Sequence, residues 1–140
     1  MHRMCIWSAL VASVGFSIVA AAEDYPMAAT KAAPAAIGQV STKTEGPNTK
    51  LAVKVDGLTS PSSVDASSRY YVVWAEPLEG GGAPQNLGAI DVGKDTKGEL
   101  KTATPLTQFQ VYVTPEPAAA IPSPSGRQLL VANVVPRPQK

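Results

Sequence analysis

Apolar and polar residues alternate along most of the chain after residue 36, with the period of two that is typical of half-buried β-strands. The clearest case is the segment 51–56, in which Leu51, Val53 and Val55 alternate with less apolar residues. The segment 69–76 is apolar on both faces, which predicts a central strand. Turn-forming residues separate these segments. The pattern predicts seven strands and no helix beyond the N-terminal region, over residues 37–43, 51–56, 69–76, 87–92, 98–104, 109–113 and 127–135.

The number and spacing of these strands predict an all-β fold. We expect a single antiparallel β-sandwich of immunoglobulin-like character, with a small Greek-key barrel as the alternative. Trp74 is expected in the core between the two sheets. Its predicted neighbours in that core are the aliphatic residues Val53, Val111 and Val131. Tyr112 is a candidate for the hydroxyl that fixes a strand corner in such folds.

The N-terminal region has a different pattern from the rest of the chain. A short cationic start precedes an uncharged apolar run, which ends in Ala20-Ala21-Ala22 and is followed by Glu23 and Asp24. These features predict an export signal that is cleaved after Ala22, and hence a periplasmic or secreted protein. The apolar run is also close to the roughly 20 residues that span a bilayer. The alternative is therefore an uncleaved anchor in the cytoplasmic membrane, with the rest of the chain facing outward.

The remaining boundaries follow from composition. The region after the signal is rich in Ala and Pro without a clear period, which indicates a flexible tether. The last residues, rich in Pro and polar residues, resemble a frayed tail. The expected organisation is a signal peptide over 1–22, a flexible tether over 23–36, a β-sandwich domain over 37–135 and a tail over 136–140.

The positions of the only cysteine and the only histidine restrict the possible chemistry. Both residues, Cys5 and His2, lie within the predicted signal peptide, so the processed chain has no thiol and no imidazole. It therefore lacks the commonest nucleophile, general base and soft-metal ligands. Of twelve Lys and Arg, removal of Arg3 leaves eleven, which balance eleven Asp and Glu. We expect no enzymatic activity, no cofactor and no nucleic-acid partner, because nucleic-acid binding needs a basic surface.

One acidic group is a candidate metal site. Asp91, Asp95 and Glu99 are spaced by four residues and supply only oxygen ligands, which suit calcium. The segment does not match an EF-hand loop, and Gly93 and Gly98 favour a hairpin between the acidic residues. A solvated turn is the favoured interpretation, and a calcium site is the alternative.

One aromatic group is a candidate binding surface. Tyr70 and Tyr71 precede Trp74 on the same predicted strand, and aromatic side chains on a sheet can form a ligand platform. Because side chains alternate along a strand, Tyr70 is expected on the face of Trp74 and Tyr71 on the opposite face. The favoured interpretation places Trp74 in the core and the tyrosines near the rim of the sheet.

Four short motifs occur in an order that resembles a known family. They are Tyr71-Val-Val-Trp74, a Gly-rich loop leading to Leu87-Gly88, Thr114-Pro-Glu-Pro117, and Pro122-Ser-Pro-Ser-Gly126 before an aliphatic strand. In this order they resemble the extracytoplasmic C-terminal domain of anti-sigma-K-type factors. The resemblance implies a β-sandwich outside the cytoplasm. It covers about half of the processed chain, and the sigma-binding module that precedes the membrane helix in that family is not expected here.

These observations predict an exported, non-enzymatic β-sandwich that serves as a binding, sensing or envelope-structural module. Its partner would be a protein or another envelope component, with membrane contact only through an uncleaved N-terminal segment. The alternative is a membrane-anchored sensor subunit of a sigma-factor pathway. A more remote alternative is a small hydrolase that uses a pair of carboxylates.

Overall fold

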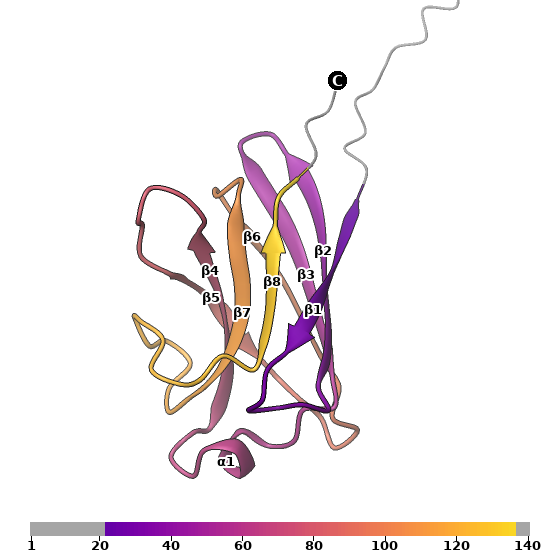
Figure 1. Cartoon of the computed structure of the whole chain (residues 1–140), viewed down its shortest axis with the longest axis vertical. Coiled ribbons are helices and arrows are strands. Elements are labelled where there is room, and N and C mark those ends of the chain that lie inside the picture. Colours follow the sequence, from indigo (N-terminus) through magenta and orange to yellow (C-terminus); the bar gives the residue numbers. More distant parts are fainter. Residues whose placement is uncertain (1–21, 137–140) are drawn as a thin grey trace, which may run out of the picture.

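A computed structural model describes residues 22–136, which form eight β-strands and one short helix (Figure 1). Every pair of neighbouring strands is antiparallel. The all-β, sandwich-like prediction is therefore confirmed, with all seven predicted strands present and one more added. The elements are β1 (Glu23–Ala29), β2 (Ile37–Glu45), β3 (Asn48–Asp56), α1 (Pro61–Val64), β4 (Tyr70–Pro77), β5 (Gln85–Ile90), β6 (Gly98–Thr104), β7 (Phe109–Glu116) and β8 (Leu130–Val134).

The strands follow one another in the order β5-β4-β7-β8-β1-β2-β3-β6 and fold into two layers. The first part of β1 pairs with β2, and Ala28 and Ala29 pair with β8, so β1 joins the two layers. The end strands β5 and β6 lie close together, although no backbone ladder joins them in the described chain. Side chains bridge this gap: Thr102 Oγ1 donates to the Leu87 carbonyl at 3.3 Å. The sandwich is therefore almost closed into a barrel.

Strand β1 corrects the predicted domain boundary. The flexible tether predicted over 23–36 is wrong for Glu23–Ala29, which forms a strand, and the folded domain begins there rather than at residue 37. Met27 is buried against Gly38 of β2, where a Cβ would lie 2.9 Å from the Met27 sulfur. Pro and Ala have low strand propensity, so the local sequence does not indicate a strand here. The strand forms because its tertiary partners stabilise it.

Two further expectations concern helices and the chain ends. The four-residue helix α1 interrupts the long connection between β3 and β4, where no helix was predicted. Within residues 22–136, no helix has the length and hydrophobicity needed to cross a membrane. The predicted signal peptide, except for Ala22, and the predicted tail beyond Pro136 lie outside the described residues.

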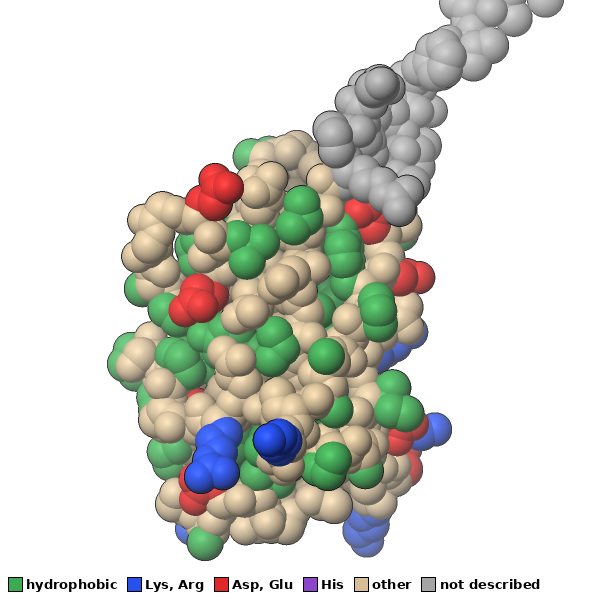
Figure 2. All heavy atoms as spheres, viewed as in Figure 1, with side chains coloured by type: hydrophobic (Ala, Val, Ile, Leu, Met, Phe, Trp, Pro, Cys, Tyr) green, Lys and Arg blue, Asp and Glu red, His purple; other side chains and the backbone are tan. Residues whose placement is uncertain are grey.

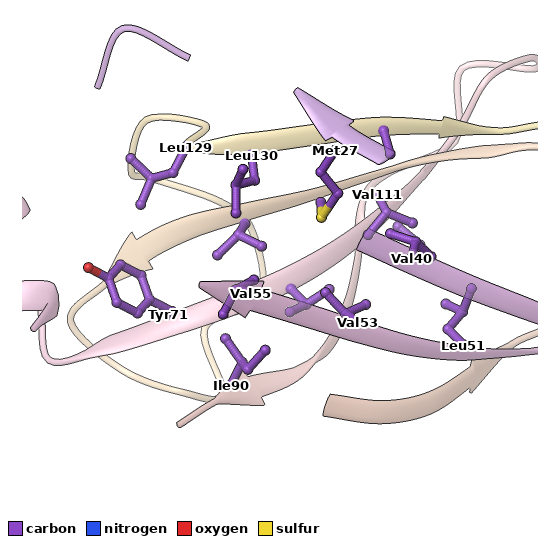
Figure 3. Packing of buried hydrophobic residues seen from close by; sticks show 14 of the residues in the cluster. Met27, Val40, Leu51, Val53, Val55, Tyr71, Ile90, Val111, Leu129 and Leu130 are labelled. Carbon is purple, nitrogen blue, oxygen red and sulfur yellow. The ribbon is translucent and has the colours of Figure 1, made fainter. Parts of the chain in front are cut away.

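The inner core lies between the two layers and is made mostly of aliphatic side chains. Figure 3 shows labelled residues from both layers pointing toward one another, with Val40 and Val53 on one side and Val111 on the other. Val53 and Val111 are completely buried, as predicted. Burial of apolar surface contributes about 25 cal/mol per Å² and is in general the dominant favourable contribution to folding.

Trp74 is buried as predicted, but on the opposite face of its strand. Because Tyr71, Val73 and Ala75 point into the inner core, Trp74 points away from it. It packs with Val72 and Tyr112 in an outer cluster, to which Ile121 and Val131 add half-buried side chains. Of its three predicted neighbours, only Val131 belongs to this cluster.

Candidate functional site

A chain of hydrogen bonds begins at the buried indole of Trp74. Trp74 Nε1 donates to Thr114 Oγ1 at 2.8 Å, and the Thr114 hydroxyl donates to Glu116 Oε2 at 2.6 Å. The register of β4 and β7 explains this arrangement. Val72 lies directly opposite Thr114, and Trp74, two residues further along β4, therefore points to the same face of the sheet as Thr114. Thr114 and Glu116 are also two residues apart, which places both side chains on that face.

Glu116 is a completely buried carboxylate whose partners are all uncharged. It accepts hydrogen bonds from the backbone N–H groups of Ser125, at 3.0 Å, and Gly126, at 3.1 Å, and a short one from the Ser125 hydroxyl. Burial raises the pKa of Glu116, but the hydrogen bonds from Ser125, Thr114 and Gly126 lower it below its usual value. Hydrogen-bond donors, rather than a cation, therefore keep this carboxylate ionised.

The loop over residues 117–128 connects β7 to β8. The Thr30 hydroxyl donates to the Gln128 carbonyl near its end, at 2.6 Å, and two further sets of hydrogen bonds fix the rest of the loop. One is the Glu116 anchor, which we define as the Glu116 carboxylate with its bonds to Ser125 and Gly126. Gly126 has no substitute there, because a Cβ would lie 2.1 Å from the carbonyl oxygen of Pro115. The other is Asn86 of β5, whose side-chain N–H groups donate to the carbonyls of Ala119, at 2.8 Å, and Ile121, at 2.9 Å.

A groove with a volume of about 490 Å³ runs between β5 and this loop. No charged side chain lines it, and the surroundings are similar: Figure 2 shows that hydrophobic and uncharged side chains cover most of the face that carries β7 and β8. We call it the β5 groove. It is lined by Asn86, Leu87, Gly88, Ala89, Ala119, Ala120, Ile121 and Pro122.

A second groove lies on the other layer, over β2, β3 and β6. Its floor includes Ile37, which is 69% exposed, and its walls carry Lys54 and Lys97 together with Asp56 and Glu99. This mixture of opposite charges is typical of a solvated strand face. The β5 groove is therefore the better candidate for a binding site, because its walls are uncharged and its loop is held by defined hydrogen bonds.

Tyr70 and Tyr71 do not form the ligand platform that was the alternative to the favoured interpretation. Tyr71 is buried in the inner core, where its hydroxyl donates to the Thr59 carbonyl at 2.6 Å. Burial raises its pKa, although the bond to Thr59 lowers it. Tyr70, on the Trp74 side of β4 as predicted, is 41% exposed and stands apart from Tyr71. The two tyrosines are thus separated by the sheet and cannot contact one ligand.

Asp91, Asp95 and Glu99 do not come together as a metal-binding group in the described chain. Residues 22–136 contain no group of three or more acidic, His or Cys residues placed to hold a metal ion. Asp95 Oδ1 instead accepts the backbone N–H of Lys97, at 3.3 Å, within the turn. Glu99 forms an ion pair with Lys101 at 3.9 Å. The three carboxylates, including that of Asp91, therefore lie along a turn and the residues on either side of it.

Tyr112 takes a different role from the predicted strand corner. Its side chain is buried in the outer cluster, and its hydroxyl makes no hydrogen bond with another residue of the described chain. Burial, together with the acidic side chains of Glu76 and Glu116, raises its pKa to about 12. Tyr112 therefore contributes an apolar ring and remains neutral over the whole physiological range.

The residues that fix the groove were not predicted as a site. Glu116 and Ser125 belong to motifs that carry only the family resemblance, and Asn86 lies between two predicted strands, 69–76 and 87–92. One signal was available in the sequence: Glu116 is the single charged residue between Lys101 and Arg127. A lone carboxylate in so long an uncharged stretch indicates a specific set of hydrogen-bond donors.

Because comparison with known proteins gives no match, the function of this protein has to be inferred from the geometry of the site. No protein-family model and no curated protein matches the chain. The resemblance to anti-sigma-K-type domains therefore stays a prediction. Its motifs Thr114-Pro-Glu-Pro117 and Pro122-Ser-Pro-Ser-Gly126 are nevertheless brought into contact by the fold, through the Glu116 anchor.

Proposed function

We propose that this protein is an exported, non-enzymatic β-sandwich that binds a protein of the cell envelope through the β5 groove. The observation that carries the proposal is the groove itself, which is uncharged and preformed. One wall is the strand β5, and the other is a loop held by Asn86 and by the Glu116 anchor. A rigid scaffold that presents a loop in a fixed conformation is a common basis of binding sites.

The lining of the groove indicates the chemistry of the partner segment. Small apolar side chains and backbone groups form most of its surface, through residues such as Ala89 and Ala120. Such a surface favours an uncharged segment with small apolar side chains, because a charged segment would lose hydration without gaining a counterion. Asn86 and the Glu116 anchor fix the loop before the partner binds, which reduces the conformational entropy lost on association.

Site-specific photo-cross-linking in the native cells tests this function. A photoreactive amino acid at Ala120, in the groove, is compared with the same amino acid at Ala103, which is exposed on the other layer. We expect one discrete protein adduct from position 120 that is absent from position 103. Ala89→Arg, which places a charge in the groove, should abolish this adduct. The same adducts from both positions, or an adduct insensitive to Ala89→Arg, would contradict the proposal.

Export is supported by the signal-like sequence before Glu23, and the fold is compatible with it. Strand β1 begins at Glu23, so cleavage after Ala22 leaves the folded domain complete. The intact mass of the exported protein should correspond to a chain that starts at Glu23. Recovery only from the cytoplasm would contradict export.

The membrane-anchored sensor remains the second candidate, and the position of β1 favours one version of it. Because β1 starts directly after the apolar segment, an uncleaved chain would hold the domain close to the membrane surface without an intervening tether. Membrane extraction of a species that retains residues 1–22 would support this candidate. A processed species in the soluble envelope fraction would exclude it.

A further inference from the structure

The loop over 117–128 covers an aromatic surface that is independent of the inner core. Ile121 packs on the outer cluster of Val72, Trp74 and Tyr112, and these residues take no part in the core between the layers. Most of the loop is otherwise exposed, including Pro117, Ala118 and Ala120. The loop can therefore leave the sheet without removing a side chain from the inner core.

The ends of the loop are fixed in the sheet, while its middle depends on side-chain contacts. Glu116 ends β7, and on the far side the Leu129 N–H donates to the Val113 carbonyl at 2.8 Å. Between these points, the contacts of the loop with the rest of the domain are Ile121, the Asn86 bonds, the Glu116 anchor and, at the end of the loop, a bond from the Thr30 hydroxyl to the Gln128 carbonyl at 2.6 Å. The anchor is the only one of these that contains an ionisable group.

We propose that the Glu116 anchor is a switch: its loss releases the loop over 117–128, widens the β5 groove and exposes Trp74, while the two-layer core stays folded. The opening of the loop rests on contacts described above. Its effect on partner binding rests on the proposed function, because Ala119 to Pro122 form one wall of the β5 groove.

Protonation of Glu116 is the chemical change that breaks the anchor. The ionised carboxylate accepts bonds from Thr114, Ser125 and Gly126, and a protonated carboxyl is a weaker acceptor that must also place a proton among these donors. The pKa of Glu116 lies below its usual value when the loop is closed. The closed loop is therefore favoured at neutral pH and loses this contribution as the pH falls through that lowered value.

In the described chain, no charged neighbour forms an ion pair with the Glu116 carboxylate. The surrounding elements carry Glu76 on β4 and Tyr112 on β7, while Asp65 and Arg69 precede β4 and Arg127 lies near the end of the loop itself. None of them forms an ion pair with Glu116 within residues 22–136. Tyr112 is neutral up to a pKa of about 12. Glu116 is thus the group expected to titrate with the loop.

Tryptophan fluorescence of the full chain tests the switch. Trp7→Phe leaves Trp74 as the only tryptophan. Emission, acrylamide quenching and far-UV circular dichroism are followed from pH 7 to pH 3. We expect Trp74 to become red-shifted and accessible to quencher while the β-sheet signal is unchanged. Coincident changes in fluorescence and circular dichroism would overturn the proposal, because they would indicate global unfolding.

Two variants assign the change to the anchor. Glu116→Gln should show the exposed Trp74 already at pH 7, without a further acid transition, because its amide group faces hydrogen-bond donors. Ser125→Ala removes one bond and should shift the opening to higher pH if Glu116→Gln fails to fold. Glu76→Gln, on the same strand as Trp74, is the matched control and should keep the wild-type transition. A Ser125→Ala transition at the wild-type pH would overturn the switch.

The outcome is separable from that of the binding proposal. If Trp74 opens with acid but position 120 gives no specific adduct, the switch stands and the β5 groove is not the binding surface. If the adduct forms but the fluorescence and circular dichroism change together, the groove binds and the loop is not a switch.

Discussion

The two apolar clusters of this domain are buried by different means. The inner core is enclosed by two layers of strands, which contribute many aliphatic side chains from every part of the fold. The outer cluster consists of Val72, Trp74 and Tyr112 on one sheet face, covered by a loop without regular structure. Its cover depends on polar contacts from Asn86 and Glu116. Burial of a large aromatic residue therefore does not by itself show that the residue holds the fold together.

The largest expected effect comes from the inner core. Phe109 is completely buried between the layers, and removal of its ring leaves a cavity that the strands cannot fill. Phe109→Ala should lower the free energy of unfolding by about 3–5 kcal/mol. Chemical denaturation followed by circular dichroism measures this value. A loss below about 1 kcal/mol would show that the layers are loosely packed and would remove the contrast between the two clusters.

A smaller effect is expected for the outer cluster, although its central residue is larger. Trp74→Ala should cost about 3 kcal/mol or less, because the loop can collapse or open over the space. Trp74→Phe is the matched control, which keeps most of the packing and loses the bond to Thr114. Denaturation curves of the three proteins measure both changes. A loss for Trp74→Ala well above that for Phe109→Ala would contradict the distinction between the clusters.

The effect of the anchor should be smaller again and should depend on pH. Glu116→Gln should destabilise the domain by about 1–3 kcal/mol at pH 7, because buried donors lose their charged acceptor. The folded pKa of Glu116 is lowered, so the contribution of the ionised carboxylate is complete above its ordinary pKa and is lost as the pH falls through the folded value.

The difference in unfolding free energy between wild type and Glu116→Gln should therefore shrink as the solution becomes acidic. Denaturation at several pH values measures this difference, with Glu76→Gln as the control for a general loss of negative charge. A difference that is constant from pH 7 to pH 3 would show that Glu116 is not ionised in the folded protein.

The sequence predicted the strands better than their faces. Alternation with a polar or exposed side located most of the expected strands, and the continuous apolar run over 69–76 located β4. In β4 both faces are apolar, so the pattern could place Trp74 opposite Tyr71 but could not say which of the two faces the inner core. That choice depends on the loop over 117–128, whose covering position is a tertiary feature.

Strand β1 and the anchor were missed for related reasons. The segment Glu23–Ala29 has a composition typical of a tether, and it becomes a strand because β2 and β8 supply its partners. Glu116 meets Ser125 only because the loop turns back at Gly126, where a side chain would collide with Pro115. Local pattern carries neither piece of information, although the isolated charge of Glu116 was visible in the sequence.

Amide hydrogen exchange tests the central claim most directly, namely that the outer cluster opens separately from the inner core. The backbone N–H groups of Ser125 and Gly126 donate to Glu116, whereas that of Val53 lies in the central part of β3, in one of the two layers that enclose the inner core. We predict that the amides of Ser125 and Gly126 exchange through a local opening, whose free energy is much lower than the opening free energy of the Val53 amide. The free energy of this local opening should not change at low denaturant concentrations. Equal opening free energies for all three amides, rising and falling together with denaturant, would contradict the account.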